Sequence, residues 1–294
     1  MRLAPLAFLP LLLAARPAAG LDWPVARVVL TATFGESRGD HFHAGIDLGG
    51  GSQEVLPIAE GEVVFAHEEG EDRSSVPVGL GSFLVLQHKG GVRSIYGHLE
   101  EGSMPRGEKR FDGSRPLGMV GATGYSLGKH LHLTIIDSEM RAILNPLAVL
   151  PPVPDRQKPV VKGLELRQGR EAEPAAGGRS FRAGTTEVLA SLYDLREDVS
   201  FAWKMAPYRI SLYQDGREVA SLKLEGLHEK LDRDGVPQLV LLGSDLGFAD
   251  LYEAEWLFRV GEVKLLPGET TLSLFAADYA GNEGSRDFLV RVSD

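Results

Sequence analysis

Short apolar runs between glycine-rich turns constrain the fold of this chain more than any other feature of its sequence. The runs have the length of strands, and β-branched or aromatic residues recur in them, as in residues 62–66 and 82–86. Helical periodicity is not sustained in residues 21–150. The 35 glycines and 17 prolines supply the turns that many short strands need. The sequence therefore predicts a mainly β protein, with antiparallel sheet and long loops in its first part.

Prolines divide the chain into two parts. Residues 151–154 hold three prolines in four positions, and Pro159 extends this stretch, which favours a semi-rigid linker over residues 151–159. Residues 21–150 are predicted to form one domain and residues 160–294 a second, and 294 residues are enough for both. We expect a fragment of residues 21–150 to fold on its own.

The second domain is also predicted to consist of short strands. Asp215-Gly216 lies between two alternating runs, which is a strong signal for a hairpin. Residues 277–282 resemble a turn of bacterial immunoglobulin-like domains, and a β-sandwich is the simplest arrangement of about seven such strands. The polar residues 170–184 are predicted to be a loop. The predicted strands are residues 160–166, 208–213, 218–222, 270–275 and 288–292.

The first 20 residues have the pattern of a secretory signal peptide. Arg2 gives a positive start, residues 3–15 are apolar, and residues 18–20 are small enough for cleavage before Leu21. The apolar run is shorter than the roughly 20 residues that span a bilayer, and an uncleaved N-terminal anchor is the alternative. We expect an exported protein without a transmembrane anchor, in the periplasm, at the cell surface or secreted.

Charge and cysteine content narrow the possible partners. The formal net charge is -10, which argues against nucleic-acid binding because phosphate contacts need a basic surface. This charge gives an anionic polymer no long-range attraction, so its recognition must be short-range, in a groove. The chain has no cysteine, which excludes disulfides and leaves His, Asp and Glu as metal ligands.

Two distant segments concentrate the residues that metal chemistry needs. The first holds His43 and Asp47, and the second holds His130 and His132; His98 lies between them. A catalytic zinc site takes three protein ligands from His, Asp or Glu and keeps one position for water. Histidines at i and i+2 on a strand point to the same face, so one can bind the metal while the other faces the water or the substrate.

Six short motifs, in this order, resemble those of the LytM/lysostaphin family of zinc metallopeptidases. Each motif is weak alone, but six in the family's order are a strong signal. The resemblance covers residues 33–150. The motifs are His43-x-Gly45-x-Asp47 and residues 57–63, 96–99, 118–124, 128–132 and 145–147.

The resemblance implies a duplicated hybrid motif fold that binds one Zn²⁺ per chain. His43, Asp47 and His132 match the family's metal ligands. His98 and His130 match its two catalytic histidines, of which one relays the water proton and the other stabilises the oxyanion; the sequence does not say which does which. The implied activity is hydrolysis of peptide cross-links of bacterial peptidoglycan by a metal-activated water. The second domain is expected to position the enzyme at the wall or against a cell-envelope protein.

Two other functions stay open at this point. Relatives that have lost ligands bind the wall without catalysis and activate wall amidases, although the ligand set of this chain is complete. Other relatives cleave glycine-rich proteins, and the sequence does not discriminate the scissile bond.

Several residues depart from the family pattern or compete with it. Thr134 stands where a glutamate is usual, so a different hydrogen bond orients His132 or none does. Lys129 replaces a more usual proline. His41 can share a strand face with His43 and compete as a ligand. Residues 68–79 form an acidic loop, at the rim of the groove or merely solvated. Residues 121–124 lack the Lys-Ser/Thr of a P-loop and are interpreted as a turn that brings His130 into place. No ligand role is expected for His67, His88 or His228.

Overall fold

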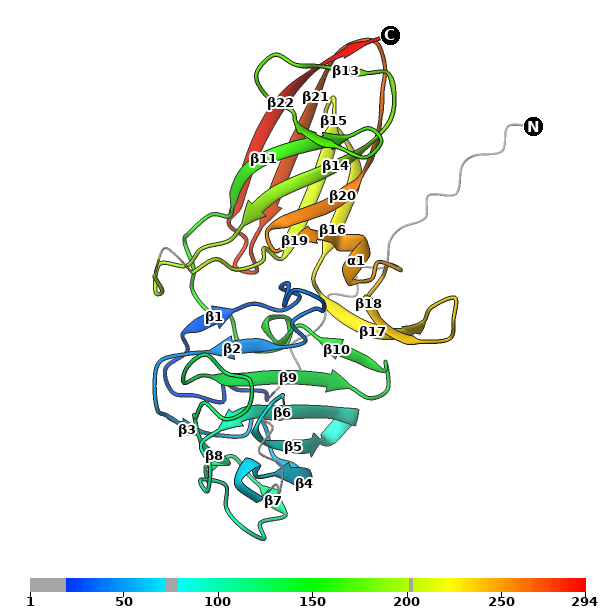
Figure 1. Ribbon diagram of the computed structural model, residues 1–294. Coiled ribbons are helices and arrows are strands. Elements are labelled where there is room, and N and C mark those ends of the chain that lie inside the picture. Colours follow the sequence, from blue (N-terminus) through cyan, green and yellow to red (C-terminus); the bar gives the residue numbers. More distant parts are fainter. Residues whose placement is uncertain (1–19, 72–78, 201–202) are drawn as a thin grey trace, which may run out of the picture.

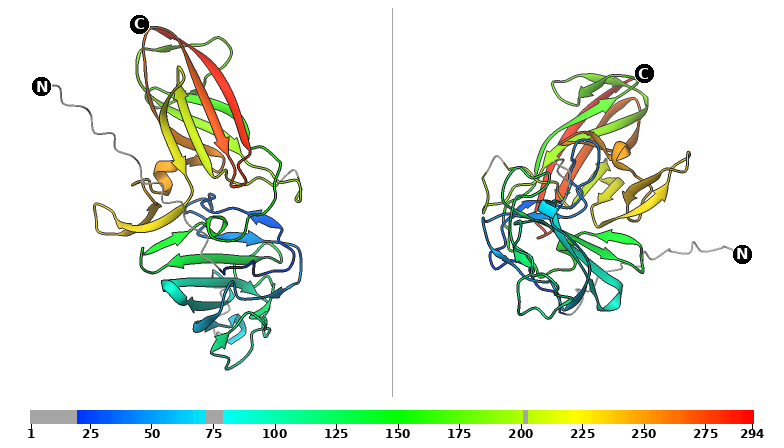
Figure 2. Two further views of the ribbon diagram at one scale, coloured as in Figure 1. Left: turned by 180° about the vertical axis from the view of Figure 1, so that it is seen from behind. Right: turned by 60° about the horizontal axis from the view of Figure 1, so that its bottom comes forward.

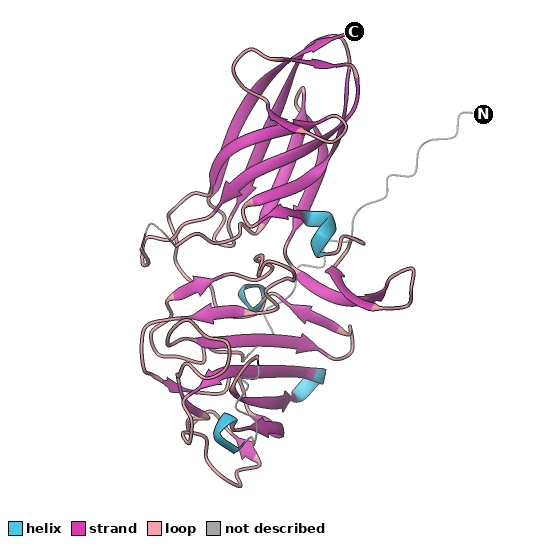
Figure 3. Cartoon of the chain, in the orientation of Figure 1, coloured by secondary structure: helices cyan, strands magenta, loops and turns pink. Residues whose placement is uncertain are grey.

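The computed structural model describes residues 20–71, 79–200 and 203–294, and strands dominate it (Figures 1 and 3). Among these residues nearly every strand pair is antiparallel, and the helical segments have three or four residues. This confirms the predicted mainly β, antiparallel fold. The predicted signal peptide, apart from Gly20, lies outside the described residues, as do residues 72–78 of the predicted acidic loop. Within the described ranges, no helix is long and apolar enough to cross a bilayer.

Residues 21–150, here called the first unit, are built on one large sheet (Figure 1). Its strands follow the order β10-β9-β6-β5-β4-β7. Strand β2 pairs with the beginning of β9 and β10 with its end, so both lie along the same edge of β9. The elements are β1 (Leu30–Ala32), β2 (Ile46–Leu48), β3 (Glu54–Val55), β4 (Gly61–His67), β5 (Ser82–His88), β6 (Val92–Leu99), β7 (Arg110–Phe111), β8 (Gly118–Met119), β9 (Leu131–Asp137) and β10 (Ala142–Leu144), with the 3-10 helices η1 (Glu69–Glu71), η2 (Lys89–Gly91) and η3 (Pro146–Ala148).

Alternation along β9 separates the core of the first unit from its functional face. Leu131, Leu133 and Ile135 are at most 1% exposed and pack in the hydrophobic core. Successive side chains of a strand point to opposite faces, so His132 and Thr134 lie on the other face of the sheet. The pattern that buries this strand thus also presents two polar side chains to one side.

Residues 160–294, the second unit, form two five-stranded sheets within their described part (Figure 1). One sheet has the order β12-β11-β14-β20-β19 and the other β13-β22-β21-β15-β16. They face each other, with β11 against β21 and β22, and β20 against β15 and β16. The immunoglobulin-like topology stays a prediction. The elements are β11 (Val160–Arg167), β12 (Ala172–Pro174), β13 (Ser180–Arg182), β14 (Gly184–Tyr193), β15 (Arg209–Gln214), β16 (Arg217–Lys223), β17 (Gly226–Leu231), β18 (Pro237–Leu241), α1 (Phe248–Leu251), β19 (Tyr252–Ala254), β20 (Leu257–Leu265), β21 (Gly268–Ala277) and β22 (Glu283–Ser293).

The predicted hairpin of the second unit is present between β15 and β16. Gln214 pairs with Arg217, and the two residues between them, Asp215 and Gly216, have φ values of 50° and 79°. Positive φ at both central positions is what a two-residue hairpin turn requires, and Asp-Gly tolerates it.

The prediction of a loop over residues 170–184 was wrong in part. Two short strands lie in it: β12 pairs antiparallel with β11, and β13 pairs parallel with β22. Each has three residues. Such short edge strands exist because a neighbouring strand offers its backbone N–H and C=O groups, and the local residue pattern does not encode this partner.

The second unit adds a hairpin to the sheet of the first. Strand β17 pairs antiparallel with β10, with Ile143 opposite Leu227, and β18 then pairs with β17. Figure 2 shows this hairpin beside β10 from two further sides. The sheet therefore contains strands from both sides of the proline-rich linker.

Candidate functional site

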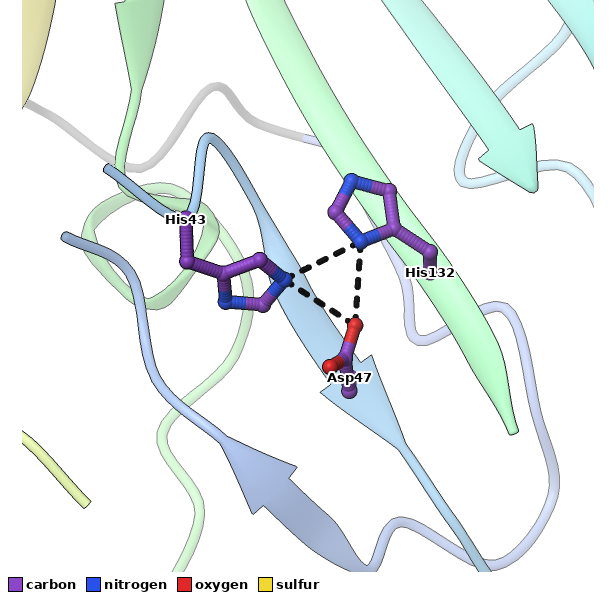
Figure 4. Close-up of side chains that lie close together, drawn as sticks. All are labelled: His43, Asp47 and His132. Carbon is purple, nitrogen blue, oxygen red and sulfur yellow. Dashed lines mark hydrogen bonds and ion pairs between the residues drawn. The ribbon is translucent and has the colours of Figure 1, made fainter. Parts of the chain in front are cut away.

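His43, Asp47 and His132 converge on one point (Figure 4). The distance from His43 Nε2 to His132 Nδ1 is 3.1 Å. Asp47 Oδ1 lies 3.1 Å from His43 Nε2 and 2.9 Å from His132 Nδ1. The three residues are at most 9% exposed.

Strand register brings Asp47 and His132 together. They lie directly opposite each other where β2 pairs with β9. Ile46 and Leu48, on either side of Asp47, are fully buried in the core, so alternation turns the carboxylate to the face that carries His132. His43 reaches the same point from the segment before β2.

Hydrogen bonds fix which ring nitrogens face this point. His43 Nδ1 donates to the carbonyl oxygen of Thr33 at 2.9 Å. The hydroxyl of Thr134 donates to the carbonyl of Ala44 at 2.9 Å, so it accepts from His132 Nε2 at 3.0 Å. Each neutral imidazole therefore turns an unprotonated nitrogen toward the other ring and toward Asp47.

Three lone-pair donors this close need a positive charge between them. A proton on one nitrogen satisfies two donors at a time, whereas a metal ion satisfies all three. Ligand atoms about 2.0–2.1 Å from a tetrahedral ion lie about 3.4 Å apart, slightly farther than the separations observed here. The donor set of His43, Asp47 and His132 thus fits a metal ion after a small opening.

Asp47 is held as an anion. Burial alone would raise its pKa, but positive charge on His43 and a hydrogen donated by His132, which a metal ion between them would replace, hold the pKa of Asp47 well below its usual range. Its second oxygen, Oδ2, accepts from Arg38 Nη2 at 2.7 Å. Oδ1 is thereby left to the two histidines. Arg38 and its buried neighbour Glu36 also line the site, and no sequence motif pointed to either of them.

A β-bulge turns His98 into the site. Ser82 of β5 pairs with Leu99 of β6, but Leu84 pairs with Tyr96, so β6 carries an extra residue there. His98 has a φ of 59°, which is uncommon for a residue other than glycine. A bulge of this kind re-aims a side chain, and the ring of His98 lies 6.0 Å from that of His132, between centroids.

His98 and His130 lie side by side, with ring centroids 4.6 Å apart. Each donates its Nδ1 hydrogen to a backbone carbonyl, His98 to Thr123 at 2.7 Å and His130 to Gly128 at 2.9 Å. The Nε2 atoms are then free to accept a proton, and that of His130 lies 3.8 Å from Asp47 Oδ1. Burial lowers the pKa of His98 to about 4, so this ring is neutral at pH 7.

The backbone of Gly121 accepts a hydrogen bond from His130 N at 3.1 Å. A Cβ atom at Gly121 would lie 2.4 Å from the backbone nitrogen of Glu100, so only glycine permits this close approach. This contact holds the segment at residues 121–124 beside His130, and its interpretation as a turn stays a prediction.

The remaining histidines lie apart from the three donors. His41 pairs with Asp40 on the surface at the rim of the cavity. His88 is buried and bonds to the carbonyl of Glu60 and the hydroxyl of Ser94. His67 packs on Phe83. His228 lies in β17, beside β10.

A cavity of about 1000 Å³ contains the five candidate residues, and the second unit forms part of its wall. Four residues from the second unit line it. The indole nitrogen of Trp203 donates to the carbonyl of Thr31 in the first unit. The sequence offered no signal for this wall, because its residues lie far along the chain from the histidines. The four residues are Trp203, Lys204, Glu255 and Trp256.

The second unit also supports the segment that carries His43. The hydroxyl of Tyr252 donates to the carbonyl of Gly35 at 2.7 Å. The ring of Phe42 packs edge-on against those of Phe248 and Tyr252, at 5.5 and 6.1 Å between centroids. The residue immediately before His43 is thus fixed by aromatic side chains from across the linker.

Sequence comparisons agree with this geometry. Residues 41–146 match the model of Peptidase family M23. A second family model, which has no description, matches residues 158–293. Over 117 residues the chain is 32% identical to the DD-carboxypeptidase/endopeptidase Mpg of Neisseria meningitidis serogroup B, an overlap of 38% of this chain and 24% of that protein. The chain thus spans about a quarter of the length of the curated relatives it matches.

Two solved structures illustrate the likeness. The catalytic domain of lysostaphin from Staphylococcus simulans is 25% identical, with a TM-score of 0.32 over 38% of this chain and 81% of that chain. The catalytic domain of the prophage-encoded M23 protein EnpA from Enterococcus faecalis is 24% identical, with a TM-score of 0.33 over 40% of this chain and 88% of that chain. Because both TM-scores are low, the likeness rests on the sequence matches, and residues 41–146 are similar to Peptidase family M23.

Proposed function

We propose that this chain is an exported zinc-dependent endopeptidase that hydrolyses peptide cross-links of bacterial peptidoglycan. The observation that carries the proposal is the convergence of His43, Asp47 and His132, with His98 and His130 beside them in one cavity. Two nitrogens and one carboxylate oxygen suit a single Zn²⁺ and leave a position for water. The relative named as a DD-carboxypeptidase/endopeptidase supports the substrate class.

When bound, zinc would lower the pKa of a water molecule and polarise the scissile carbonyl. The chain's own residues do the rest. The Nε2 atoms of His98 and His130 accept and return a proton, because each ring holds its other hydrogen on a backbone carbonyl. After protonation, either ring can donate a hydrogen bond to the oxyanion of the tetrahedral intermediate.

The second unit has a role inside the cavity in this proposal. Trp203 and Trp256 offer apolar surface, and Lys204 and Glu255 offer opposite charges to a peptide substrate. Such a wall provides the short-range recognition that an acidic protein needs for an anionic polymer. Docking of the second unit at the wall or on an envelope protein is a further part of the proposal, as is export by the segment at residues 1–20.

The test is digestion of purified muropeptides and of ordinary proteins side by side, with product masses measured. We expect one zinc per chain by elemental analysis, and peptide cleavage only in muropeptides. Alanine at His43, Asp47 or His132 should abolish both zinc retention and cleavage. His98→Ala and His130→Ala should keep zinc but reduce turnover by about 10²–10⁴-fold.

His41→Ala is the matched control, because His41 is an exposed histidine of the same segment and should keep full activity. Loss of zinc in that variant would make His41 a ligand. A zinc-loaded wild-type chain that releases no product from either substrate would favour the alternative, a wall-binding regulator or amidase activator. Cleavage of the proteins but not of the muropeptides would show that the substrates are proteins.

A further inference from the structure

A cluster of carboxylates in the second unit has no part in the proposed hydrolysis. Asp155 comes from the linker, Asp194 follows β14 in one sheet, and Asp278 follows β21 in the other. One oxygen of each lies within 4.8 Å of the other two. Asp194 and Asp278 are 4% and 5% exposed, and the side chain of Asp155 is 3% exposed.

Asp194, one of the three carboxylates of this cluster, has a buried and unsatisfied oxygen. Its Oδ1 atom is buried and has no hydrogen-bond partner among the described residues. A carboxylate in that position is strongly unfavourable unless a positive charge reaches it. Burial and the neighbouring Asp278 raise the pKa of Asp194 to about 8, as expected for a carboxylate that lacks a compensating charge.

Positive charge from the protein itself is scarce here. Arg196 is the cation beside the cluster within the described ranges, and it bonds to Asp155 Oδ2 at 3.0 Å. Its Nε also pairs with Asp198 at 3.0 Å, so its charge is shared. No ion pair joins Asp194 or Asp278 to a described Lys, Arg or His side chain. Three acidic groups thus share part of one cation.

The turn at residues 277–282 orients the cluster. The backbone nitrogen and the side-chain amide of Asn282 donate to the two oxygens of Asp278, at 2.8 and 2.6 Å. The same amide donates to the backbone carbonyl of Asp155 at 3.1 Å. Each carboxylate oxygen keeps a second lone pair, so these bonds fix the oxygens without using them up.

We propose that Asp155, Asp194 and Asp278 bind one Ca²⁺ ion, which fastens the linker to both sheets of the second unit. The candidate ligands are oxygens, which suit a hard cation, and no histidine belongs to this cluster. Bonds of about 2.3–2.6 Å let calcium contact oxygens up to about 5 Å apart. Magnesium is usually held by one or two carboxylates and several waters, so three buried carboxylates favour calcium.

Calorimetric titration of the zinc-loaded full chain with CaCl₂ tests the site. We expect one Ca²⁺ per chain with a dissociation constant of roughly 10⁻⁶–10⁻³ M, a higher melting temperature in calcium, and slower proteolysis at residues 151–159. Asp194→Asn and Asp155→Asn should each weaken binding by about tenfold or more, because affinity follows the charge of the ligands. Asp198→Asn, a neighbouring aspartate outside the cluster, and His132→Ala, at the zinc site, should bind calcium as the wild type does.

A wild-type chain that takes up no calcium at millimolar concentration would overturn the proposal. So would Asp194→Asn and Asp155→Asn variants that bind like the wild type, or an Asp198→Asn variant that loses binding with them. If Asp194→Asn fails to fold, Asp155→Asn and Asp278→Asn decide in its place. Equal affinity for Mg²⁺ would overturn the choice of calcium.

Discussion

Thr134 determines which nitrogen of His132 faces the other donors. Its hydroxyl hydrogen is directed to the Ala44 carbonyl, so only a lone pair is left for His132 Nε2. That arrangement keeps the hydrogen of His132 on Nε2 and leaves Nδ1 free to bind a metal. The hydroxyl therefore supplies the orienting hydrogen bond at the position where the family resemblance predicts a glutamate.

Replacing Thr134 by valine should weaken zinc binding. Valine has the same shape but no hydroxyl, so the hydrogen on His132 Nε2 loses its acceptor inside the protein. We expect zinc affinity to fall by about 10–100-fold, the usual effect of losing such a partner, in competition titrations with a chelator. Thr134→Ser, which keeps the hydroxyl, should bind like the wild type. Equal affinity of the valine variant would mean that Thr134 does not orient the ring.

Glu36 should make stability depend on pH. Burial raises its pKa from 4.5 to about 7. The folded state then keeps a proton that the unfolded state releases, so the free energy of unfolding falls as pH rises from about 4.5 to about 7. The Glu36→Gln variant has no group to ionise at this position. Its free energy of unfolding should therefore fall over this pH window by up to about 3 kcal/mol less than that of the wild type. Urea unfolding at pH 4.5 and pH 7.5 measures this, and identical pH profiles would contradict it.

At the scale of the element, the sequence predicts strands whose side chains alternate between buried and exposed. It does not predict which strands pair with each other. The runs within β5 and β21 show in the sequence because one face of each is buried, and Asp215-Gly216 gives its hairpin through local φ preferences. The strands β12 and β13 exist only beside their neighbours. The pairing of β17 with β10 joins segments that no local pattern connects.

The features of the candidate site also divide into those that the sequence predicts and those that it does not. Its five named residues were found because they lie in short contiguous motifs, which a sequence displays directly. The salt bridge of Arg38 to Asp47, the bulge at His98 and the wall around Trp203 arise from register and from packing between the units. Such contacts depend on the folded backbone, so the residue types alone do not reveal them.

Gly45 sets the spacing between β2 and β9, and Gly45→Ala should open it. The new Cβ atom would lie 2.5 Å from the carbonyl of Leu133 and 2.7 Å from His132 Nε2. We expect a loss of about 1–3 kcal/mol in the free energy of unfolding, together with weaker zinc retention. Gly128→Ala is the control, because a Cβ there meets no atom within 4 Å. Equal zinc retention in both variants would show that β2 and β9 tolerate the extra atom.

At the scale of the whole molecule, the two units build one site together. The second unit supplies a cavity wall, the β17–β18 hairpin and the support of Phe42 and Gly35. These contacts indicate that residues 21–150 need the second unit for full activity, although the domain boundary itself stays a prediction. The linker joins two parts that touch each other extensively.

A fragment of residues 21–150 should therefore lose activity on muropeptides and on intact wall alike. We expect a fall of about 10²-fold or more, because small displacements of catalytic groups have effects of that size. Tyr252→Phe is the milder test in the full chain, since it removes only the hydrogen bond to Gly35; it should reduce activity on both substrates in the same proportion. A fragment that digests muropeptides normally but fails on intact wall would show that the second unit acts as a tether.

The pairing of β10 with β17 also governs when the sheet can be finished. Leu144 and Gly226 are neighbours in the sheet but are separated in the sequence by the linker and by the six strands β11 to β16. Contacts between such distant segments form slowly, because the long loop between them must close first. During synthesis the four histidines of the candidate site, the last of which is His132, are made well before the hairpin that completes their sheet. A newly made chain should thus acquire hydrolytic activity as a late event, after its second half has folded.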